Sequence, residues 1–132
     1  MRTVMKNATK FPKRIWLVGG SEGIGLALVK QLLLANCQLV VSARNAEQNT
    51  ELLTLQTQAP KQLFLLKCDV TDKALLSGNC YQAWSVYDGL DCWIYNAGVY
   101  HPMRLQEWDI EAFDTMNQVN YLGAVYLMNH LL

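Results

Sequence analysis

The sequence predicts an α/β fold, a doubly wound sheet of parallel strands with helices on both of its faces. Short apolar runs alternate four times with longer segments of helical character along the 132 residues, which is the pattern of successive β–α–β units. A glycine-rich turn at Val18–Gly25 joins the first apolar run to the first helical segment. The length allows one domain with a hydrophobic core, and an apolar fraction of 52% is that of a globular protein.

The first half of the chain contains two strands and two helices. The residues Ile15–Val18 are continuously apolar, as expected of a parallel strand that is buried on both faces. The predicted elements are, in order, a strand at Arg14–Val18, a helix at Gly23–Ala35, a strand at Gln38–Ala43 and a helix around Ala46–Gln58.

The second half repeats this alternation. Its predicted elements are a strand at Gln62–Lys67, a helix near Lys73–Val86, a strand at Leu90–Tyr95 and a final helix that starts after Trp108 and runs to the C-terminus. Thr71 or Asp72 can cap the third helix, which Ser77-Gly78-Asn79 weakens. The tryptophans are interpreted as core or helix-packing residues, namely Trp16, Trp84, Trp93 and Trp108.

Right-handed crossovers place the four strands in the order 3-2-1-4, so the connections reverse direction between strands one and four. Ligands of open parallel sheets bind at the carboxyl ends of the strands beside such a reversal. The glycine turn follows strand one, and Asn96-Ala97-Gly98 follows strand four. We therefore expect both segments to line one crevice.

The glycines of the turn are Gly19, Gly23 and Gly25. A glycine-rich turn between a strand and a helix directs backbone N–H groups and the positive end of the helix at one point, which favours phosphate. The spacing is not G-x-G-x-x-G, because Leu28 stands where the third glycine would be. The absence of Gly-Lys-Ser/Thr excludes a P-loop.

The turn resembles that of the short-chain dehydrogenase/reductase family, which is written T-G-x-x-x-G-I-G. Gly19, Gly23, Ile24 and Gly25 match this pattern, and Val18 replaces its threonine. The resemblance covers the chain after residue 13 and implies a Rossmann fold that binds a nicotinamide dinucleotide. It also implies hydride transfer between the nicotinamide and a carbonyl or secondary alcohol.

Three later segments match the family in order and spacing. Asp69–Val70 resembles its D-V pair, whose aspartate bonds the adenine amino group. Tyr95–Gly98 resembles N-N-A-G, with Tyr95 in place of the first asparagine. Val119–Gly123 resembles the N-x-x-G of the fourth helix, so that Asn120 corresponds to the asparagine of the catalytic tetrad, which holds a water in the proton relay. The residues expected to contact the cofactor are Gly19, Ser21, Gly23, Ile24, Gly25, Arg44, Asp69, Val70, Asn96, Ala97 and Gly98.

The end of strand two distinguishes the two nicotinamide dinucleotides. NAD-binding proteins carry an acid there, about 20 residues after the glycines, which bonds the ribose 2′-hydroxyl. Here Ala43 and Arg44 occupy that place, and a guanidinium suits a 2′-phosphate. We therefore predict NADP(H) rather than NAD(H), with Glu22 and Glu47 as nearby acids that oppose this preference.

The family's general acid/base is a tyrosine followed four residues later by a lysine. No tyrosine of this sequence has a lysine at that spacing, and no lysine follows Lys73. We therefore expect residues 14–132 to be the N-terminal half of a domain that is inactive alone. The alternatives are a non-catalytic NAD(P)-binding or sensing module that is complete at this length, and a methyltransferase. Ala43 and Arg44 argue against a methyltransferase, which would need an acid at the end of strand two.

Charge and cysteine content narrow the class of partner. Five of the eleven basic residues lie in the first fourteen positions, which predicts a flexible basic leader at residues 1–13 rather than a nucleic-acid-binding surface. No apolar run reaches the roughly 18 residues of a membrane span. Four cysteines without a C-x-x-C pair indicate buried thiols in the cytoplasm and no metal site. The expected partners are a small carbonyl or alcohol substrate and, from the resemblance, further copies of the parent protein in a homo-dimer or homo-tetramer.

Overall fold

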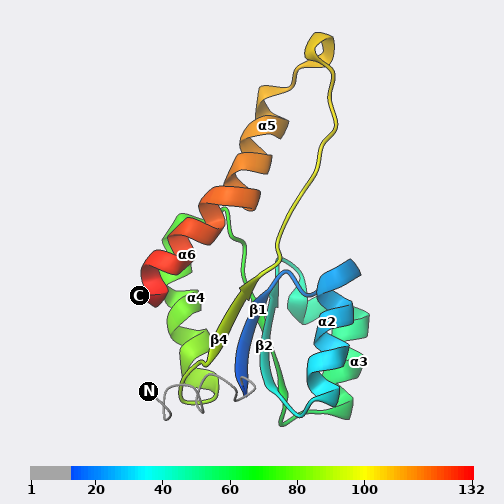
Figure 1. The fold of residues 1–132 in the computed structure, drawn as a ribbon, viewed down its shortest axis with the longest axis vertical. Coiled ribbons are helices and arrows are strands. Elements are labelled where there is room, and N and C mark those ends of the chain that lie inside the picture. The colour runs from blue at the N-terminus through cyan, green and yellow to red at the C-terminus, as the bar shows by residue number, and fades with distance from the viewer. Residues whose placement is uncertain (1–12) are drawn as a thin grey trace, which may run out of the picture.

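The computed structural model describes residues 13–132 (Figure 1). The basic leader predicted at residues 1–13 therefore lies, apart from Lys13, outside the described residues. The centre is a parallel sheet of four strands, β1 (Arg14–Val18), β2 (Gln38–Ala43), β3 (Leu63–Lys67) and β4 (Cys92–Tyr95). Its strand order is β3-β2-β1-β4, which confirms the predicted order.

The strands pair in a register that brings their carboxyl ends level. Val18 at the end of β1 pairs with Ser42 of β2 and with Tyr95 of β4. Ala43 of β2 pairs with Lys67 of β3. The segments that follow the four strands therefore emerge at the same edge of the sheet, where open parallel sheets bind their ligands.

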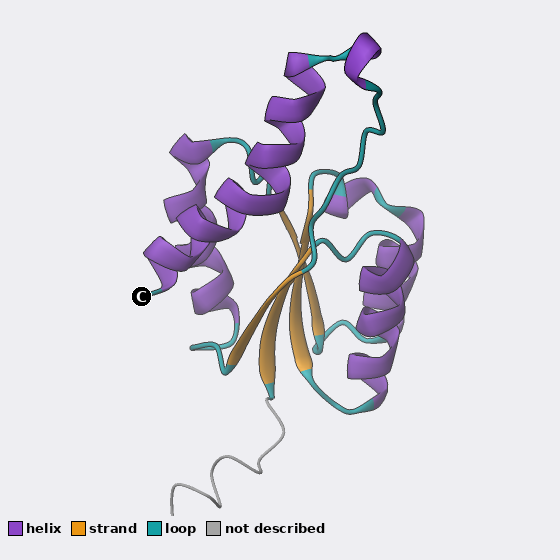
Figure 2. Ribbon diagram, turned by 45° about the horizontal axis from the view of Figure 1, so that its top comes forward, coloured by secondary structure: helices purple, strands orange, loops and turns teal. Residues whose placement is uncertain are grey.

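Helices cover both faces of the sheet (Figure 2). α2 (Gly23–Leu34) and α3 (Thr50–Gln58) pack on one face. α4 (Lys73–Val86) and α6 (Gly123–Leu131) pack on the other. Among the residues that the structure describes, none of the helices has the length and apolarity to cross a lipid bilayer.

Two hydrophobic cores follow from the alternation of side chains along the strands. Ile15 and Leu17 of β1 lie in the core beneath α2 and α3, whereas Trp16 and Val18 lie in the core beneath α4 and α6. All four side chains are at most 2% exposed. The indole Nε1 of Trp16 donates to the hydroxyl of Ser42 at 2.9 Å, so two buried polar side chains satisfy each other.

The helix predicted at Ala46–Gln58 is two elements. A 3-10 turn, η1 (Ala46–Gln48), is followed by Asn49 in an extended conformation, and α3 begins only at Thr50. The side-chain oxygen of Asn49 accepts a hydrogen bond from the N–H of Leu52 at 3.0 Å. Asparagine is among the strongest N-caps. The side chain of Asn49 therefore starts a new helix within a segment that the apolar pattern predicts as one helix.

The other boundaries agree with the predictions within two residues. α2 ends one residue before Ala35, and β3 and β4 begin one and two residues later than expected. α4 has the predicted bounds and runs unbroken through Gly78. Asp72 occupies its N-cap position, as one of the two predicted alternatives, but the Asp72 side chain makes no capping hydrogen bond.

The final helix begins where it was predicted but is not uniform. Asp109 caps its start, because the carboxylate accepts from the N–H groups of Glu111 and Ala112. Its successive parts are α5 (Ile110–Asn117), a π-helical segment η3 (Gln118–Leu122) and α6. α5 and the loop before it, which includes the 3-10 turn η2 (Leu105–Glu107), reach away from the sheet (Figure 1).

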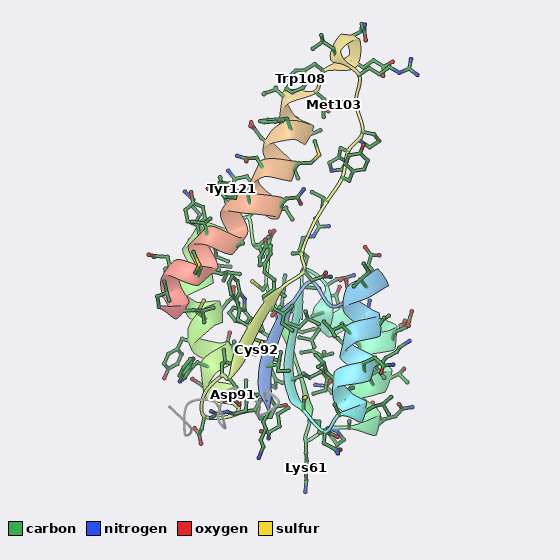
Figure 3. The ribbon with its side chains drawn as sticks, viewed as in Figure 1. Lys61, Asp91, Cys92, Met103, Trp108 and Tyr121 are labelled. Carbon is green, nitrogen blue, oxygen red and sulfur yellow. The ribbon has the colours of Figure 1, made fainter. Side chains whose placement is uncertain are left out.

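The four tryptophans differ in burial. Trp16 is fully buried and Trp93 is partly buried. Trp84 and Trp108 are 51% and 53% exposed, so they do not belong to the core. Trp108 lies at the far end of the projecting arm (Figure 3), where its ring packs against Phe113 at a centroid distance of 5.4 Å.

Candidate functional site

The glycine turn after β1 is held against the segment that follows β4. The N–H groups of Gly19 and Gly20 both donate to the carbonyl of Ser42, at 2.7 and 3.3 Å. Gly19 has a φ of +94°, and a Cβ there would lie 2.4 Å from the backbone nitrogen of Ala97. Glycine alone accommodates both that conformation and that close approach.

Asn96 holds the same turn from the other side. Its backbone N–H donates to the carbonyl of Val18 at 2.7 Å, and its Nδ2 donates to the carbonyl of Gly19 at 3.0 Å. A Cβ on Gly25 would lie 1.9 Å from the Gly19 oxygen and 2.8 Å from Asn96 Nδ2. The crossover from β1 to α2 and the segment after β4 therefore form one closely packed unit.

The outer part of the turn is open. Gly23 has a φ of +54°, and a Cβ there would meet no atom within 4 Å. α2 begins at Gly23, and Glu22 at its N-cap makes no side-chain capping bond. Ile24 in the first turn is 79% exposed, and no acidic side chain lies in that turn. The N–H groups at this end of α2 therefore offer a place where the helix dipole favours an anion.

Ser21, in the middle of the turn, is tied to the crossover that follows β2. The Nδ2 of Asn49 donates to the carbonyl of Ser21 at 3.2 Å, while the Oδ1 of Asn49 caps α3. Arg44, which is exposed, directly follows β2 in the same crossover. Sequence reasoning missed this link, although an asparagine directly before Thr50-Glu51 is an N-cap signal.

Asp69, after β3, is a carboxylate with one oxygen already engaged. Its Oδ1 accepts from the N–H and the hydroxyl of Thr71, at 3.0 and 2.7 Å. Burial opposes ionisation of Asp69, but the Thr71 hydrogen bonds and the charges of Arg44 and Lys67 outweigh it and lower the pKa below the ordinary value. The side chain therefore closes a local turn and also stands as an ionised acceptor at the sheet edge.

Asn120 binds the backbone of the segment after β4. Its Oδ1 accepts from the N–H of Val99 at 2.7 Å, and its Nδ2 donates to the carbonyl of Val99 at 2.8 Å. Gly98 lies alongside, with the Asn120 Oδ1 3.6 Å from the position of a Cβ. The helix and the loop are thus fastened together one residue beyond Gly98.

Tyr95 makes a contact that the sequence did not indicate. Its phenol hydroxyl donates to the carbonyl of Val119, within η3. Burial, with a smaller contribution from Cys68, raises the pKa of Tyr95 to about 12. This side chain is therefore a protonated hydrogen-bond donor at neutral pH.

A model of the family described as short chain dehydrogenase matches residues 13–132. The chain belongs to the short-chain dehydrogenase family. The glycine turn is locked, in that Ser42 and Asn96 hold it by hydrogen bonds. The family and this turn both indicate a fold that binds a nicotinamide dinucleotide.

Several known proteins are similar to most of the chain. A fatty acyl-CoA reductase of Acinetobacter baylyi is 31% identical over 122 residues, which cover 88% of this chain and 40% of that protein. A 3-ketodihydrosphingosine reductase of Dictyostelium discoideum is 31% identical over 142 residues, which cover 93% of this chain and 42% of that protein. A short-chain dehydrogenase/reductase of Serratia marcescens, 28% identical, superposes with a TM-score of 0.79 over 90% of this chain and 49% of its own. The chain thus spans less than half the length of these relatives.

The short-chain dehydrogenase fold distributes the predicted contact residues along one edge of the sheet. At or beside the glycine turn lie Gly19, Ser21, Gly23, Ile24, Gly25, Asn96, Ala97 and Gly98. Arg44 and Asp69 follow the neighbouring strands β2 and β3. Val70 differs, because its side chain is 7% exposed and belongs to the core beneath α6. The Val70 side chain is therefore not available to a ligand, contrary to the prediction that included it.

Clustered metal ligands are not a feature of this site. Within residues 13–132, no three or more His, Cys, Asp or Glu side chains gather in an arrangement that could hold a metal ion. The groups that the site presents are backbone N–H groups, amides, a guanidinium and a carboxylate. Such groups suit a phosphorylated organic ligand.

Proposed function

We propose that this chain is the dinucleotide-binding part of an NADP(H)-dependent oxidoreductase that interconverts a small carbonyl compound and a secondary alcohol. The observation that carries the proposal is the locked glycine turn, whose open outer side and helix N-terminus fit a diphosphate. When bound, the nicotinamide supplies or accepts the hydride. The two curated relatives described above are both named reductases, which supports this reaction class.

The dinucleotide would lie along the carboxyl edge of the sheet. We place the diphosphate at the N–H groups around Ser21–Ile24, where a side chain at Gly23 would meet no atom. Asp69 is an ionised acceptor suited to the adenine amino group. Asn96 and Gly98 would stand nearer the nicotinamide ribose, because they follow β4 beside the turn.

Arg44 supports NADP(H) over NAD(H). It is exposed directly after β2, where an NAD-binding relative would present an acid to the ribose 2′-hydroxyl. Asn49, five residues later, links this segment to Ser21, so the guanidinium and the diphosphate site belong to one connected structure. A charge-assisted contact with a 2′-phosphate contributes about 1.5–3 kcal/mol.

Titration of the protein with NADPH and with NADH tests this assignment. Arg44→Ala is expected to weaken NADPH binding by about 10- to 150-fold, the equivalent of one charge-assisted contact, and to leave NADH binding unchanged. Lys61→Ala is the matched control, because Lys61 is an exposed cation at the opposite end of the sheet (Figure 3). Tighter binding of NADH than of NADPH by the unaltered chain would overturn the preference.

We propose Asn120 as the residue of this chain that takes part in the reaction. Because Val99 engages both polar atoms of its amide, a water of the proton relay would be held by the backbone carbonyl of Asn120 or by the remaining lone pair of Oδ1. No Tyr-x-x-x-Lys is present in the sequence. The chain alone is therefore expected to bind NADPH without oxidising it when ketones are added, as measured by NADPH absorbance.

A non-catalytic NAD(P)-binding module is the second candidate. It would use the same nucleotide contacts at the glycine turn, for binding without turnover. The coding sequence beyond Leu132 separates the two. A continuing frame with Ser and Tyr-x-x-x-Lys supports the oxidoreductase, whereas a stop codon supports the module.

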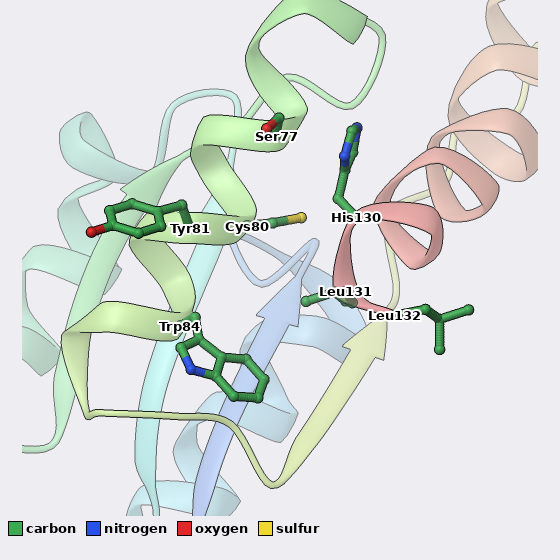
Figure 4. Close-up of a pocket in the computed structure, with 7 residues that line it drawn as sticks. All are labelled: Ser77, Cys80, Tyr81, Trp84, His130, Leu131 and Leu132. Atoms are coloured by element: carbon green, nitrogen blue, oxygen red, sulfur yellow. The ribbon is translucent and has the colours of Figure 1, made fainter.

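We further propose that copies of the protein pair through the face formed by α4 and α6. A hollow of about 420 Å³ lies between these helices (Figure 4), lined by Ser77, Cys80, Tyr81, Trp84, His130, Leu131 and Leu132. The thiol of Cys80 points toward α6 (Figure 4), 3.8 Å from the carbonyl of Leu127, and Tyr81 and Trp84 are 76% and 51% exposed. Large exposed apolar side chains around a hollow are typical of a protein interface. The expected state is a homo-dimer or homo-tetramer.

The buried thiols support a cytoplasmic location. Cys68 and Cys80 are 3% and 5% exposed, and burial raises their pKa values to about 12 and 11. Both are thiols and not disulfides, as is usual for proteins of a reducing compartment. We place the protein in the cytoplasm on this ground.

A further inference from the structure

We propose that Tyr95 is a positioning residue for Asn120, because its phenol hydroxyl holds the carbonyl of Val119 at the π-helical break in the final helix. The proposal rests on the role proposed above for Asn120. Tyr95 is the last residue of β4, and Val119 directly precedes Asn120. One hydrogen bond therefore ties the end of β4 to the residue next to Asn120.

The π-helical segment explains why the Val119 carbonyl takes a side-chain donor. In a regular α-helix, the N–H of Gly123 would donate to Val119, four residues earlier. Here the N–H of Gly123 donates to Gln118, five residues earlier. The hydroxyl of Tyr95 donates to the Val119 carbonyl in place of that N–H. Such π-helical turns are rare in proteins, and many of those that occur lie at functional sites.

Gly123 and Trp93 lie close to the side chain of Tyr95. A Cβ on Gly123 would lie 2.5 Å from the Tyr95 hydroxyl oxygen and 2.9 Å from the Cβ of Val70. Trp93 packs edge-on against the Tyr95 ring at a centroid distance of 5.9 Å. The glycine therefore makes room for the phenol, and an asparagine at position 95, as in the family's N-N-A-G pattern, would be too short to reach the same carbonyl.

Two consecutive helix residues are thus fastened to the β4 connection. Val119 is held by Tyr95 through its backbone carbonyl, and Asn120 is held by Val99 through its side-chain amide at 2.7 and 2.8 Å. The first contact fixes the path of the helix backbone, and the second fixes the loop against it. Because burial raises the pKa of Tyr95 to about 12, the hydroxyl keeps its proton and donates throughout the neutral range.

Tyr95→Phe tests the proposal, because it removes the hydroxyl and leaves the ring. Amide hydrogen exchange and the side-chain resonances of Asn120 are measured by nuclear magnetic resonance on isotope-labelled chain. The Val99 N–H is expected to exchange about tenfold faster in the variant, in proportion to the loss of one hydrogen bond, and the Asn120 amide resonances are expected to move. NADPH affinity is expected to stay close to that of the unaltered chain, because the bond between Asn96 and Gly19 is untouched.

Tyr87→Phe is the matched control. Tyr87 is also a half-buried phenol whose pKa is raised by burial, but it donates to the carbonyl of Leu39 at 3.4 Å, away from the final helix. The control should leave Val99 and Asn120 unchanged. Equal effects in the two variants, or none in Tyr95→Phe, overturn the proposal.

A second variant reaches the same contact without removing the hydroxyl. Gly123→Ala places a methyl group against the Tyr95 oxygen and is expected to reproduce the faster exchange of Val99. Failure of the unaltered chain to bind NADPH would contradict the proposed function. The exchange of Val99 would still decide the role of Tyr95, because that measurement needs no cofactor.

Discussion

Single glycines of this chain differ in what surrounds them, and so in what they do. A Cβ on Gly19 would lie 2.4 Å from the Ala97 nitrogen, and its φ of +94° is one that other residues rarely adopt. A Cβ on Gly78, in the exposed part of α4, would meet nothing within 4 Å. The first glycine is required by the site, whereas the second only weakens a helix.

The same substitution should therefore have opposite effects at these two positions. Gly19→Ala is expected to lower the free energy of unfolding by more than about 2 kcal/mol, because a positive φ costs about 1–2 kcal/mol and a backbone clash is added. Gly78→Ala is expected to raise it by about 0.5–1 kcal/mol, since alanine favours the helix. Urea denaturation measures both. A Gly19→Ala chain of unaltered stability would disprove the close packing described for the turn.

Asp91 determines part of the pH dependence. Its carboxylate accepts from Nε and Nη2 of Arg14 at 3.1 and 2.9 Å. These hydrogen bonds lower the pKa of Asp91 from 3.8 to about 2. Because the folded value lies below the unfolded one, the contribution is fully present above about pH 4 and is lost as the pH falls toward 2.

Asp91→Asn is accordingly expected to reduce the loss of stability between about pH 4 and pH 2. Denaturation followed by circular dichroism at several pH values measures the slope, with Asp114→Asn as an exposed control on α5. Since the two side chains of the pair are 33% and 36% exposed, added salt should weaken the effect. An unchanged slope in Asp91→Asn would show that the pair does not contribute.

Among the elements, the crossover after β2 contains several contacts that the apolar pattern does not predict. Asn49 ends η1, caps α3 and donates a hydrogen bond to the carbonyl of Ser21 in the glycine turn. The two hydrogen bonds use different atoms of one amide. They can therefore be separated by substitution.

Asn49→Ser keeps a capping oxygen but is too short to reach Ser21, so it should retain stability and weaken NADPH binding about 3- to 10-fold. Asn49→Ala should show the same loss of affinity and lower the free energy of unfolding by about 1 kcal/mol. Calorimetric titration and urea denaturation measure the two effects. Unchanged NADPH affinity in both variants would remove Asn49 from the site.

The strands were predicted more accurately than the helix interruptions, for a physical reason. A buried parallel strand is a continuous apolar run, and β1 and β2 have the expected bounds. The break at Asn49 and the π-helical segment at Gln118–Leu122 instead depend on one hydrogen bond each. A single hydrogen bond of this kind does not alter the apolar periodicity of a sequence, so the pattern does not reveal it.

For the molecule as a whole, the exposed face formed by α4 and α6 bears on the oligomeric state. Apolar side chains of this face, Tyr81 and Trp84 among them, stand exposed. Burying such side chains against a second copy removes their apolar surface from water, which favours association.

Trp84→Glu is expected to shift the protein toward the monomer, because a charge would be buried in the pair. Size-exclusion chromatography with light scattering measures the mass. Leu34→Glu is the matched control, since Leu34 is 77% exposed on α2, in the opposite helical layer. A monomeric unaltered chain at high concentration would contradict pairing through this face.

The order of the elements, the sheet topology, the glycine turn and the family followed from patterns that are local in the chain, because apolar periodicity and glycine spacing are set by neighbouring residues. The contacts of Tyr95 with Val119, of Asn120 with Val99 and of Asn49 with Ser21 did not. Each joins side chains to backbone more than twenty residues away. Such partners meet only after the sheet has brought the strand ends level, and no spacing in the sequence encodes their distance.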